Sequence, residues 1–537
     1  MDCRALAFRH LPHQPPLFLD YVDQFDKVRV FYSHPPTISA VTGASKNVDY
    51  PAERRSAVVR ILQKQNSAFG ASTQTNANIQ RLANGAVAVV SGQQVGLFGG
   101  PAYAIYKALT AIQIAEELTR GGMEAVPVFW MATEDHDLEE VRHASWFENG
   151  KLIRFELPDG NAEGKPVGRI ALGAQIEQFA REAAELLQKQ GAEQLAQFVA
   201  QSYKAEESYG SAFGKLFARL FAAQGLILMD PLDAGLHRAA APLYQHALAE
   251  RDELNAKLLQ RERDLERAGY AAQVRVTAKS TLLFYLGNGA REAVTASDAE
   301  FHASGKNWPR EELVHLTHAE PENFSPNALF RPVVQDYLLP TVAFIGGPAE
   351  LSYIAQSALV YQHLLGRMPV MLPRAGFTLV DAKASKLLDR YDLTVEEVWS
   401  GSQELRHKME KQALPGSLAE EFDRDQKQIA EMLSKLGAKI EALDATLKGT
   451  VEKTKEGIEF HLDKLRRKAG TALDQKAGLL AAHEQHLESL LNPHKALQER
   501  ELCLLPFLAR LGASGLGELQ ELCSGKSLGH HFIVQLP

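Results

Sequence analysis

Two strand-to-helix turns of the same composition, far apart in the sequence, most constrain the fold of this chain. Gly99-Gly100-Pro101-Ala102 follows the apolar run Ala86–Gly92, and Gly346-Gly347-Pro348-Ala349 follows an apolar run that begins at Thr341. Each run is short, apolar and ended by glycine, as a buried strand is. Proline suits the first helical turn, where its missing N–H has no partner to lose. Both segments therefore predict a strand, a glycine turn and a helix.

Further apolar runs extend this pattern into a sheet. Ala102–Leu118 is apolar at helical spacing, and Val126–Ala132 is another continuous apolar run. Strands are also predicted at Gly225–Asp230 and Met368–Arg374, the first followed by a helical pattern over 236–267. Buried strands that alternate with helices are typical of an α/β fold with a parallel sheet. In a doubly wound sheet, ligands bind at the carboxyl ends of the strands, where the two glycine turns lie.

The sequence divides into three parts by composition. Residues 1–385 carry the predicted α/β core, and the more charged segments near 150–220 and 268–325 are predicted to be insertions in it. Residues 386–500 are rich in alanine, lysine, glutamate, leucine and glutamine, which favours a helical domain. Short apolar pieces return in residues 501–537, which are expected to rejoin the core.

The helical part carries a heptad seam. Its steps alternate mostly between four and three residues, as in a coiled coil. Such a seam fits two antiparallel helices packed on each other, or a coiled coil that makes a homodimer, and the length of the seam favours the dimer. The seam consists of Ile429, Leu433, Leu436, Ile440, Leu443, Leu447, Thr450, Thr454, Ile458, Leu462, Leu465 and Ala469.

Charge and cysteine content exclude several classes of protein. The net charge of −8 argues against a nucleic-acid partner and against an anionic membrane surface. The most apolar long stretch, Thr341–Leu365, contains polar residues that a membrane-spanning helix would carry at high cost. Cys3, Cys503 and Cys523 form neither a disulfide scaffold nor a zinc-ligand spacing. We expect a soluble protein of the cytoplasm.

An acidic cluster directly follows the predicted strand at Val126–Ala132. Glu134, Asp135, His136 and Asp137 place carboxylates and an imidazole together at a strand end. Such a group can coordinate a divalent ion through Asp135 and Asp137, or act as acid and base. Acidic residues also stabilise a first helical turn, so a structural role is the alternative. The crowding of like charges favours a functional site, because it requires a cation or protonated ligand between them.

The loop before the first GGPA turn is a second candidate site. Its glycines allow backbone N–H groups to approach an anion, and the following helix N-terminus adds positive potential. The alternative is a tight turn that needs glycine for steric reasons alone. Lys107, two turns into the helix, is interpreted as a solvated surface lysine. The candidate binding residues here are Ser91, Gly92, Gln93, Gln94, Gly96, Gly99 and Gly100.

A third candidate site surrounds the second GGPA turn. The planar guanidinium of Arg331 is suited to clamp a carboxylate or phosphate, and Glu350 is suited to hold an amine. A structural ion pair between Arg331 and Asp336 is the equal alternative. The remaining candidates of this site are Gln335, Gly346, Gly347 and Tyr353.

Four stretches of the chain resemble one known family. They are SGQQVGLFGGPAYAIYKALTAI, VPVFWMATEDHDLEEV, LFRPVVQDYLLPTVAFIGGPAELSYIAQ, and Asn492-Pro493 with Leu497-Gln498-Glu499-Arg500. Together they resemble the cysteine-ligase family of bacillithiol biosynthesis, over about residues 85–385 and again across the coiled coil to the tail. The strings are long and unusual, so the resemblance is specific.

The resemblance implies both a fold and a reaction. The fold is a Rossmann-like parallel sheet core with connecting-peptide insertions and an α-helical coiled coil that dimerises. The reaction joins the carboxyl group of cysteine to the amine of glucosaminyl-malate, the last step of bacillithiol synthesis. Because a carboxylate does not acylate an amine unaided, we expect ATP, and with it Mg²⁺, to activate the carboxyl group, through an acyl-adenylate or an acyl-phosphate.

One assignment of roles follows from these candidates. The glycine loop and Arg331 would bind anionic groups, the 134–137 cluster would bind a metal or the substrate amine, and His136 would be the general base. Two other classes of protein stay open: a metal-dependent nucleotide hydrolase or phosphotransferase, and a structural coiled-coil protein with an inactive core.

Overall fold

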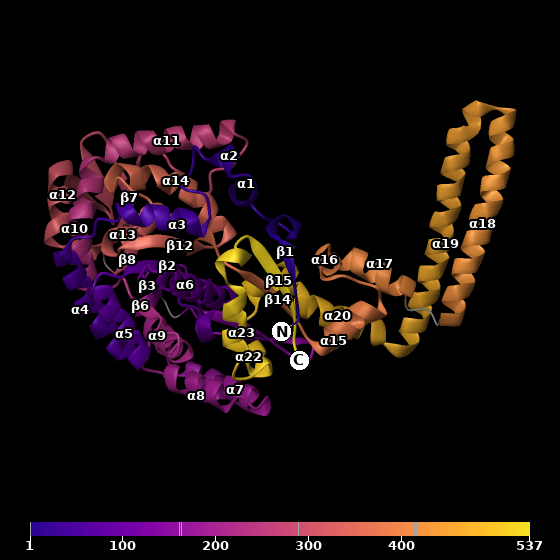
Figure 1. Cartoon of the computed structure of the whole chain (residues 1–537), viewed down its shortest axis with the longest axis horizontal. Helices are drawn as coiled ribbons and strands as arrows, with labels where there is room; N and C mark the ends of the chain where they lie inside the picture. Colours follow the sequence, from indigo (N-terminus) through magenta and orange to yellow (C-terminus); the bar gives the residue numbers. More distant parts are fainter. Residues whose placement is uncertain (1, 160–161, 163, 288, 413–415) are drawn as a thin grey trace. The chain divides into compact units, whose positions relative to one another are not determined.

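The computed structural model describes residues 2–159, 162, 164–287, 289–412 and 416–537 (Figure 1). The chain forms two compact units. The first unit comprises Met1–Trp146, Ile153–Thr378 and Glu499–Val534, and the second comprises Phe147–Leu152, Leu379–Gln498 and Gln535–Pro537. The chain therefore leaves the first unit after Thr378 and enters it again at Glu499.

A five-stranded sheet forms the core of the first unit, and all its neighbouring strands are parallel. This confirms the predicted parallel sheet and its five predicted strands. β2 and β12, the strands that precede the two GGPA turns, are neighbours, so both turns lie at the same edge of the sheet. In spatial order the strands are β13 (Val370–Pro373), β12 (Thr341–Gly346), β2 (Val87–Gln93), β3 (Ala125–Met131) and β6 (Ile227–Met229).

Helices cover this sheet. α6 (Tyr103–Arg120) follows the first glycine turn as predicted, and it packs with α3 (Ile38–Ala44) on the residues of β2, β12 and β13 in one buried apolar cluster. α4 (Ala52–Phe69) contacts β6, and α5 (Thr73–Ala83) contacts β3 and β6. The predicted helical pattern over 236–267 is two helices, α10 (Ala234–Ala249) and α11 (Arg251–Arg267), because Glu250 leaves helical geometry.

The two segments predicted as insertions have structures of their own. The first contains α7 (Gln175–Lys189), α8 (Glu193–Ser202) and α9 (Tyr209–Leu220). The second contributes to an antiparallel sheet of β10 (Lys306–Pro309), β9 (Glu300–Ala303), β8 (Ala290–Ala296), β7 (Ser280–Gly287) and β11 (Phe324–Pro326). Residues 160, 161, 163 and 288 of these segments lie outside the described residues.

The remaining elements belong wholly or mainly to the first unit, and β4, β5, β14, α21 and β15 each include residues of the second unit. Helices α13 and α14 flank β12 in the sequence, and α12 follows β10. Their bounds, with those of the terminal elements, are β1 (Cys3–Ala7), α1 (Pro16–Asp23), α2 (Phe25–Val28), β4 (His143–Glu148), β5 (Lys151–Glu156), α12 (Arg310–Ala319), α13 (Arg331–Leu338), α14 (Pro348–Leu364), β14 (Gly376–Val380), α21 (Gln498–Glu501), α22 (Leu505–Leu511), α23 (Gly515–Leu522) and β15 (His530–Gln535).

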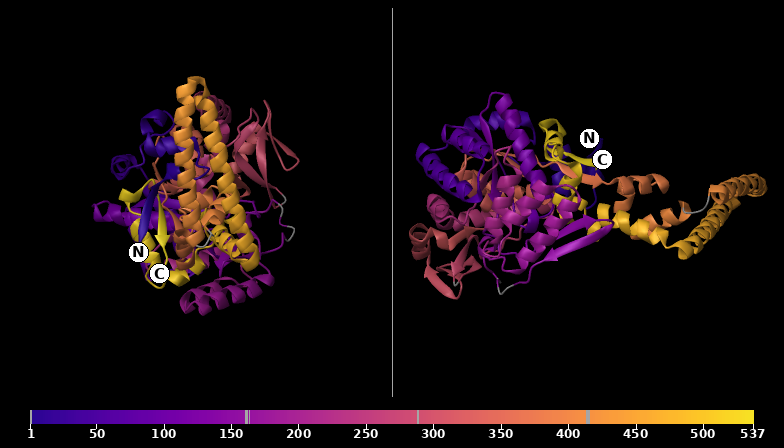
Figure 2. Two further views of the ribbon diagram at one scale, coloured as in Figure 1. Left: turned by 90° about the vertical axis from the view of Figure 1, so that its right-hand side faces the viewer. Right: turned by 90° about the horizontal axis from the view of Figure 1, so that it is seen from below.

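The second unit is helical, and its longest helices form a hairpin. α18 (Gly416–Leu443) and α19 (Lys448–Ala477) lie side by side and run in opposite directions (Figure 2). Val451 of α19 fits against Gly437 of α18, where a Cβ atom would come within 2.6 Å of it, and Arg466 pairs with Asp423 at 2.6 Å. The other helices are α15 (Ala382–Arg390), α16 (Val395–Trp399), α17 (Ser402–Gln412) and α20 (Leu479–Leu491).

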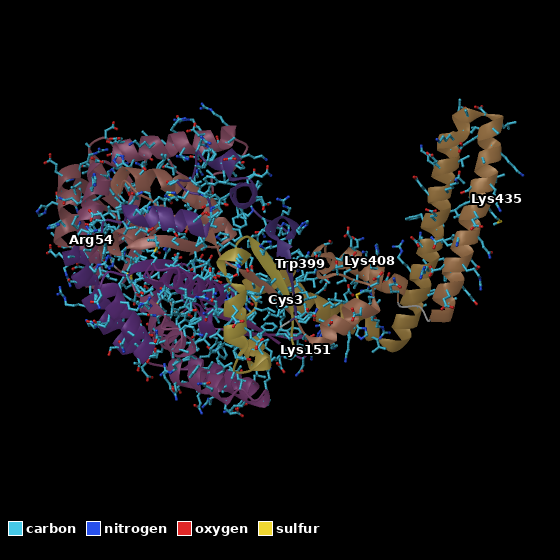
Figure 3. All side chains as sticks on the ribbon, viewed as in Figure 1. Cys3, Arg54, Lys151, Trp399, Lys408 and Lys435 are labelled. Carbon is cyan, nitrogen blue, oxygen red and sulfur yellow. The ribbon has the colours of Figure 1, made fainter. Side chains whose placement is uncertain are left out.

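The seam is only partly covered within this hairpin. Leu436, Leu443 and Leu465, all seam residues, are more than half exposed, as are Met432 and Phe460. Figure 3 shows side chains projecting outward along both helices, with Lys435 among them. Among the described residues, no helix is both long and apolar enough to cross a membrane.

Candidate active site

A cavity of about 680 Å³ opens at the carboxyl ends of β2, β3 and β12 in the first unit. Gln93, Ala132 and Gly347, at or just after the ends of these strands, all line it. Its further walls come from α6, α11, α13, α14 and the antiparallel sheet. Among the described lining residues, seven are basic and four are acidic, so the cavity favours anionic ligands. This is the edge of the sheet at which the sequence predicts ligand binding.

Lys107 lies at the centre of this site, and its prediction as a surface lysine is wrong. The side chain is 2% exposed because α6 packs against the sheet on that face. Its ammonium group donates to the carbonyl of Gly92 at 2.9 Å and to Oε1 of Gln93 at 2.6 Å, and it pairs with Glu350. Burial lowers the pKa of Lys107 to about 8, while the Glu350 carboxylate opposes this change. The lysine is therefore still mostly charged at neutral pH.

Gly92 allows β2 and β3 to lie close together beside Lys107. A Cβ atom at this position would lie 2.5 Å from the backbone oxygen of Trp130, which is closer than any side chain tolerates. Only glycine lets β2 approach β3 this closely, and the approach sets the end of β2 where Lys107 reaches it. Gln93 also donates from Nε2 to the hydroxyl of Tyr103 at 2.9 Å. The polar groups at the end of β2 are thus held in fixed positions.

The second GGPA turn supplies an acidic and a basic group. Glu350 accepts from the N–H of Gly347 at 2.9 Å and so caps the first turn of α14. Arg331 donates to Oε1 of Gln335 at 3.2 Å and hydrogen-bonds to the hydroxyl of Tyr353. Arg331, Gly347, Glu350 and Tyr353 all line the cavity. Arg331 and Asp336, both described residues, do not form the ion pair that was the alternative role for Arg331.

A buried arginine after β13 is one of the basic residues that line the cavity. We call this set the basic wall; it consists of Lys107, Arg251, Arg275, Arg291, Arg331, Arg374 and Arg500. Arg374, 4% exposed, pairs with Glu499 through Nη1 at 2.9 Å and Nη2 at 2.6 Å. The same carboxylate accepts from the N–H of Phe377 at 3.1 Å. This bidentate contact fixes the plane of the guanidinium and holds the Glu499 segment in place. Its neighbour Arg500 lines the same cavity.

Glu134 is the buried acid of the site. It lines the cavity and is 6% exposed, and burial raises its pKa to about 7, an effect that the Arg291 guanidinium partly opposes. Its Oε1 lies 3.5 Å from Nε2 of His237. Burial lowers the pKa of His237 to about 4, so this ring is neutral and the contact is not an ion pair. Glu134 can therefore bind or release a proton near neutral pH.

The other members of the acidic cluster have different surroundings. Asp135 lines the cavity and accepts from Nε2 of Gln94 at 3.2 Å and from the N–H of His136 at 2.8 Å. His136 is 41% exposed, and its Nδ1 lies 3.1 Å from Nη1 of Arg291. Asp137 accepts from the N–H of Glu140 in a local turn. Neither His136 nor Asp137 is among the described residues that line the cavity.

Several predicted ligand-binding residues have structural contacts instead. Ser91 joins β2 to β12 by donating to the carbonyl of Ile345 at 2.9 Å. The N–H of Gly99 is occupied by the hydroxyl of Tyr203, and that of Gly100 by the carbonyl of Leu97. The ligand-binding roles of these residues stay predictions. The predicted site residues that do not line the cavity are Ser91, Gly96, Gly99, Gly100, His136, Asp137, Gln335, Asp336 and Gly346.

Asp336 and Gln335 are packed inside the first unit behind the cavity. Asp336 accepts from the hydroxyl of Tyr361 and from Nε2 of Gln335 at 3.0 Å. Burial raises the pKa of Asp336, while the hydroxyl of Tyr361 opposes this change. Asp336 therefore joins α13 to α14, and Gln335 orients its carboxylate.

Among the described residues, the predicted metal ligands Asp135 and Asp137 belong to no group of three ligand side chains, and their role stays a prediction. Asp135 alone of the two lines the cavity. A hard ion such as Mg²⁺ often takes one or two carboxylates together with phosphate oxygens, so Asp135 fits that use and Asp137 does not.

Of the basic residues that line the cavity, only Arg331 was predicted from the sequence as a binding residue. Lys107, Arg291, Arg374 and Arg500 all line the cavity. A signal was available for Lys107, because its helix is apolar on every side and has no obvious solvent face. Arg374 ends a predicted strand, the position that singled out the acidic cluster. No local sequence pattern indicates that Arg291 or Arg500 belongs to the site, because each comes from a separate segment of the chain.

Comparison with known proteins gives matches along almost the whole chain. The family described as "Bacillithiol biosynthesis BshC, N-terminal Rossmann-like domain" matches residues 1–375, and "Bacillithiol biosynthesis BshC, C-terminal coiled-coil domain" matches residues 377–535. The Rossmann-like core and the coiled coil expected from the resemblance are thereby confirmed.

Individual relatives agree with the family match. A protein of Koribacter versatilis, named "Putative cysteine ligase BshC", is 40% identical over 95% of this chain and 95% of its own length. Proteins with the same name from Solibacter usitatus and Salinibacter ruber are 36% and 32% identical, over 95% and 97% of this chain and 96% of each relative. This chain belongs to the BshC family of bacillithiol biosynthesis.

Proposed function

We propose that this protein is the ligase that joins the carboxyl group of cysteine to the amine of glucosaminyl-malate to form bacillithiol. The observation that carries the proposal is the pairing of a basic wall with one protonatable acid in a single cavity. Lys107, Arg331 and Arg374 suit the binding of carboxylates and phosphates, and both substrates are anionic at a carboxylate. The names of the relatives support the same reaction.

Glu134 is the proposed general base. The amine of glucosaminyl-malate must lose a proton as its nitrogen bonds to the carbonyl carbon of cysteine. A carboxylate with a pKa of about 7 in a buried position is suited to accept that proton. Glu134 replaces His136 in this role, because the imidazole lies outside the cavity and contacts Arg291.

The basic wall suits the binding of a nucleoside triphosphate. Arg331, Arg374 and Arg500 would hold its phosphates, and Asp135 would hold an accompanying Mg²⁺. ATP would supply activation of the cysteine carboxyl group. The chain's own part is to neutralise and orient the anionic groups and to keep Lys107 beside them, where its pKa of about 8 leaves it charged.

We further propose that the α18–α19 hairpin makes a homodimer. Met432, Leu436, Leu443, Phe460 and Leu465 expose apolar surface on these two helices, and a second copy of the hairpin would cover it.

The test follows product and nucleotide together. The full-length protein is incubated with cysteine, glucosaminyl-malate, Mg²⁺ and ATP, leaving out one component at a time, and mass spectrometry measures bacillithiol, AMP and ADP. We expect bacillithiol only in the complete mixture, and about 10²–10⁴-fold less in Glu134→Gln. Glu139→Gln, whose side chain is 67% exposed, is the matched control. Nucleotide loss without cysteine would indicate a hydrolase. Full activity of Glu134→Gln would exclude Glu134 as the general base.

A further inference from the structure

Outside the cavity, two histidines and a glutamate converge at the end of α10. His246 and Glu250 lie one helical turn apart, and His363 comes from the last turn of α14. One ligand atom from each residue lies within 4.8 Å of the other two. We propose that this cluster binds a divalent transition-metal ion, Zn²⁺ being the best fit. Two imidazoles and one carboxylate form a known three-residue zinc site, with a fourth position for water.

The separations fit a tetrahedral ion. Nε2 of His246 lies 3.1 Å from Oε2 of Glu250, and Nε2 of His363 contacts the same carboxylate oxygen. With zinc–ligand bonds of about 2.0–2.1 Å, tetrahedral ligand atoms are about 3.3 Å apart. Small side-chain shifts therefore suffice to place an ion between the three groups.

The neighbours of His363 can adjust to a bound ion. Its Nδ1 lies 2.8 Å from the ammonium of Lys257 and 3.7 Å from Oε1 of Glu253. A metal bound to Nε2 leaves Nδ1 protonated. The ammonium of Lys257 cannot accept a hydrogen bond from this N–H, because it has no lone pair. Lys257, 41% exposed, also pairs with Glu253 at 2.7 Å. If its ammonium turned into solvent, Nδ1–H could donate to Glu253 instead. A carboxylate in that place is the usual support of a zinc-bound histidine.

The site is accessible and joins two helices of the first unit. The side chains of His246 and Glu250 are 45% and 42% exposed, so an ion and water can reach them from solvent. His363 is 10% exposed and anchors the cluster on α14. An ion here would tie α10 to α14, the helix whose first turn carries Glu350. The proposal uses no residue of the cavity and is independent of the ligase activity.

The test measures the binding of zinc alone to the full-length protein. The protein is first treated with a chelator, and it carries no histidine tag. Calorimetric titration with zinc chloride should give one site per chain, and bound Co²⁺ should show the visible absorption of a four-coordinate ion. His246→Gln and Glu250→Gln should each weaken zinc binding at least about tenfold. His315→Gln, an exposed histidine on α12, is the matched control and should bind zinc as the parent does.

Three results would overturn the proposal. They are absence of zinc binding by the parent protein, equal zinc affinity in the parent and the double variant His246→Gln/Glu250→Gln, and loss of zinc binding in Asp135→Asn instead. The melting temperature of each variant in chelator checks that it folds. Because His246 is nearly half exposed, its replacement should leave that temperature unchanged.

Discussion

Replacing Glu134 by glutamine should make the protein more stable, and the gain should depend on pH. The native pKa of Glu134 is about 7 against an ordinary value of 4.5, because burial disfavours the carboxylate. Between these pH values the folded chain binds more protons at this residue than the unfolded chain does. The free energy of unfolding therefore falls as the pH rises from 4.5 to 7, and the loss is complete above 7.

The size of the effect follows from the two pKa values. A difference of about 2.5 pKa units corresponds to about 3 kcal/mol, since one unit is about 1.4 kcal/mol. Glutamine has nearly the same shape and no charge, so Glu134→Gln removes this penalty. We expect equal stability of parent and variant near pH 4.5, and a variant about 3 kcal/mol more stable at pH 8.

Urea unfolding followed by tryptophan fluorescence measures this difference from pH 4.5 to pH 8. Trp130, Trp146 and Trp308 belong to the first unit, so the signal reports mainly on the unit that holds Glu134. Glu139→Gln is the control and should change the free energy of unfolding by less than about 1 kcal/mol at each pH, because its ion pair is exposed. A stability difference between Glu134→Gln and the parent that does not vary with pH would refute the reasoning.

Three other changes test separate parts of the structure. Glu499→Ala leaves the buried Arg374 charge unpaired and should cost about 3–5 kcal/mol in urea unfolding, and a cost below about 1 kcal/mol would contradict the buried pair. Lys107→Met removes a cation from the cavity and should raise the KM for the anionic substrates, so an unchanged KM counts against its role. Leu436→Glu with Leu443→Glu should give a monomer in analytical ultracentrifugation, and a persisting dimer would exclude the hairpin as its interface.

The sheet could be predicted because its strands are buried on both faces. All five strands of the parallel sheet read as largely apolar runs, and glycines mark their ends: Gly92 is the next-to-last residue of β2 and Gly346 the last residue of β12. The break between α10 and α11 could not be predicted, since one residue, Glu250, leaves helical geometry inside a pattern that continues beyond it. Apolar spacing averages over several turns and does not register a single irregular residue.

The site was predictable only where it coincides with strand ends. Gln93, Glu134 and Gly347 follow predicted strands, and all three line the cavity. Arg291 and Arg500 reach the same cavity from the antiparallel sheet and from the segment that follows the second unit. Their positions depend on tertiary packing between distant segments, which local sequence patterns do not encode.

The pairing of Arg374 with Glu499 has a consequence for how the protein is made. The two residues are 125 positions apart, and most of the second unit is encoded between them. A ribosome that adds about 5–20 residues per second needs roughly 6–25 s to pass from one to the other. During this interval the nascent parallel sheet holds an arginine without its carboxylate, and Arg500 has not yet been added. The binding cavity is therefore completed late in translation, after the helical hairpin has left the ribosome.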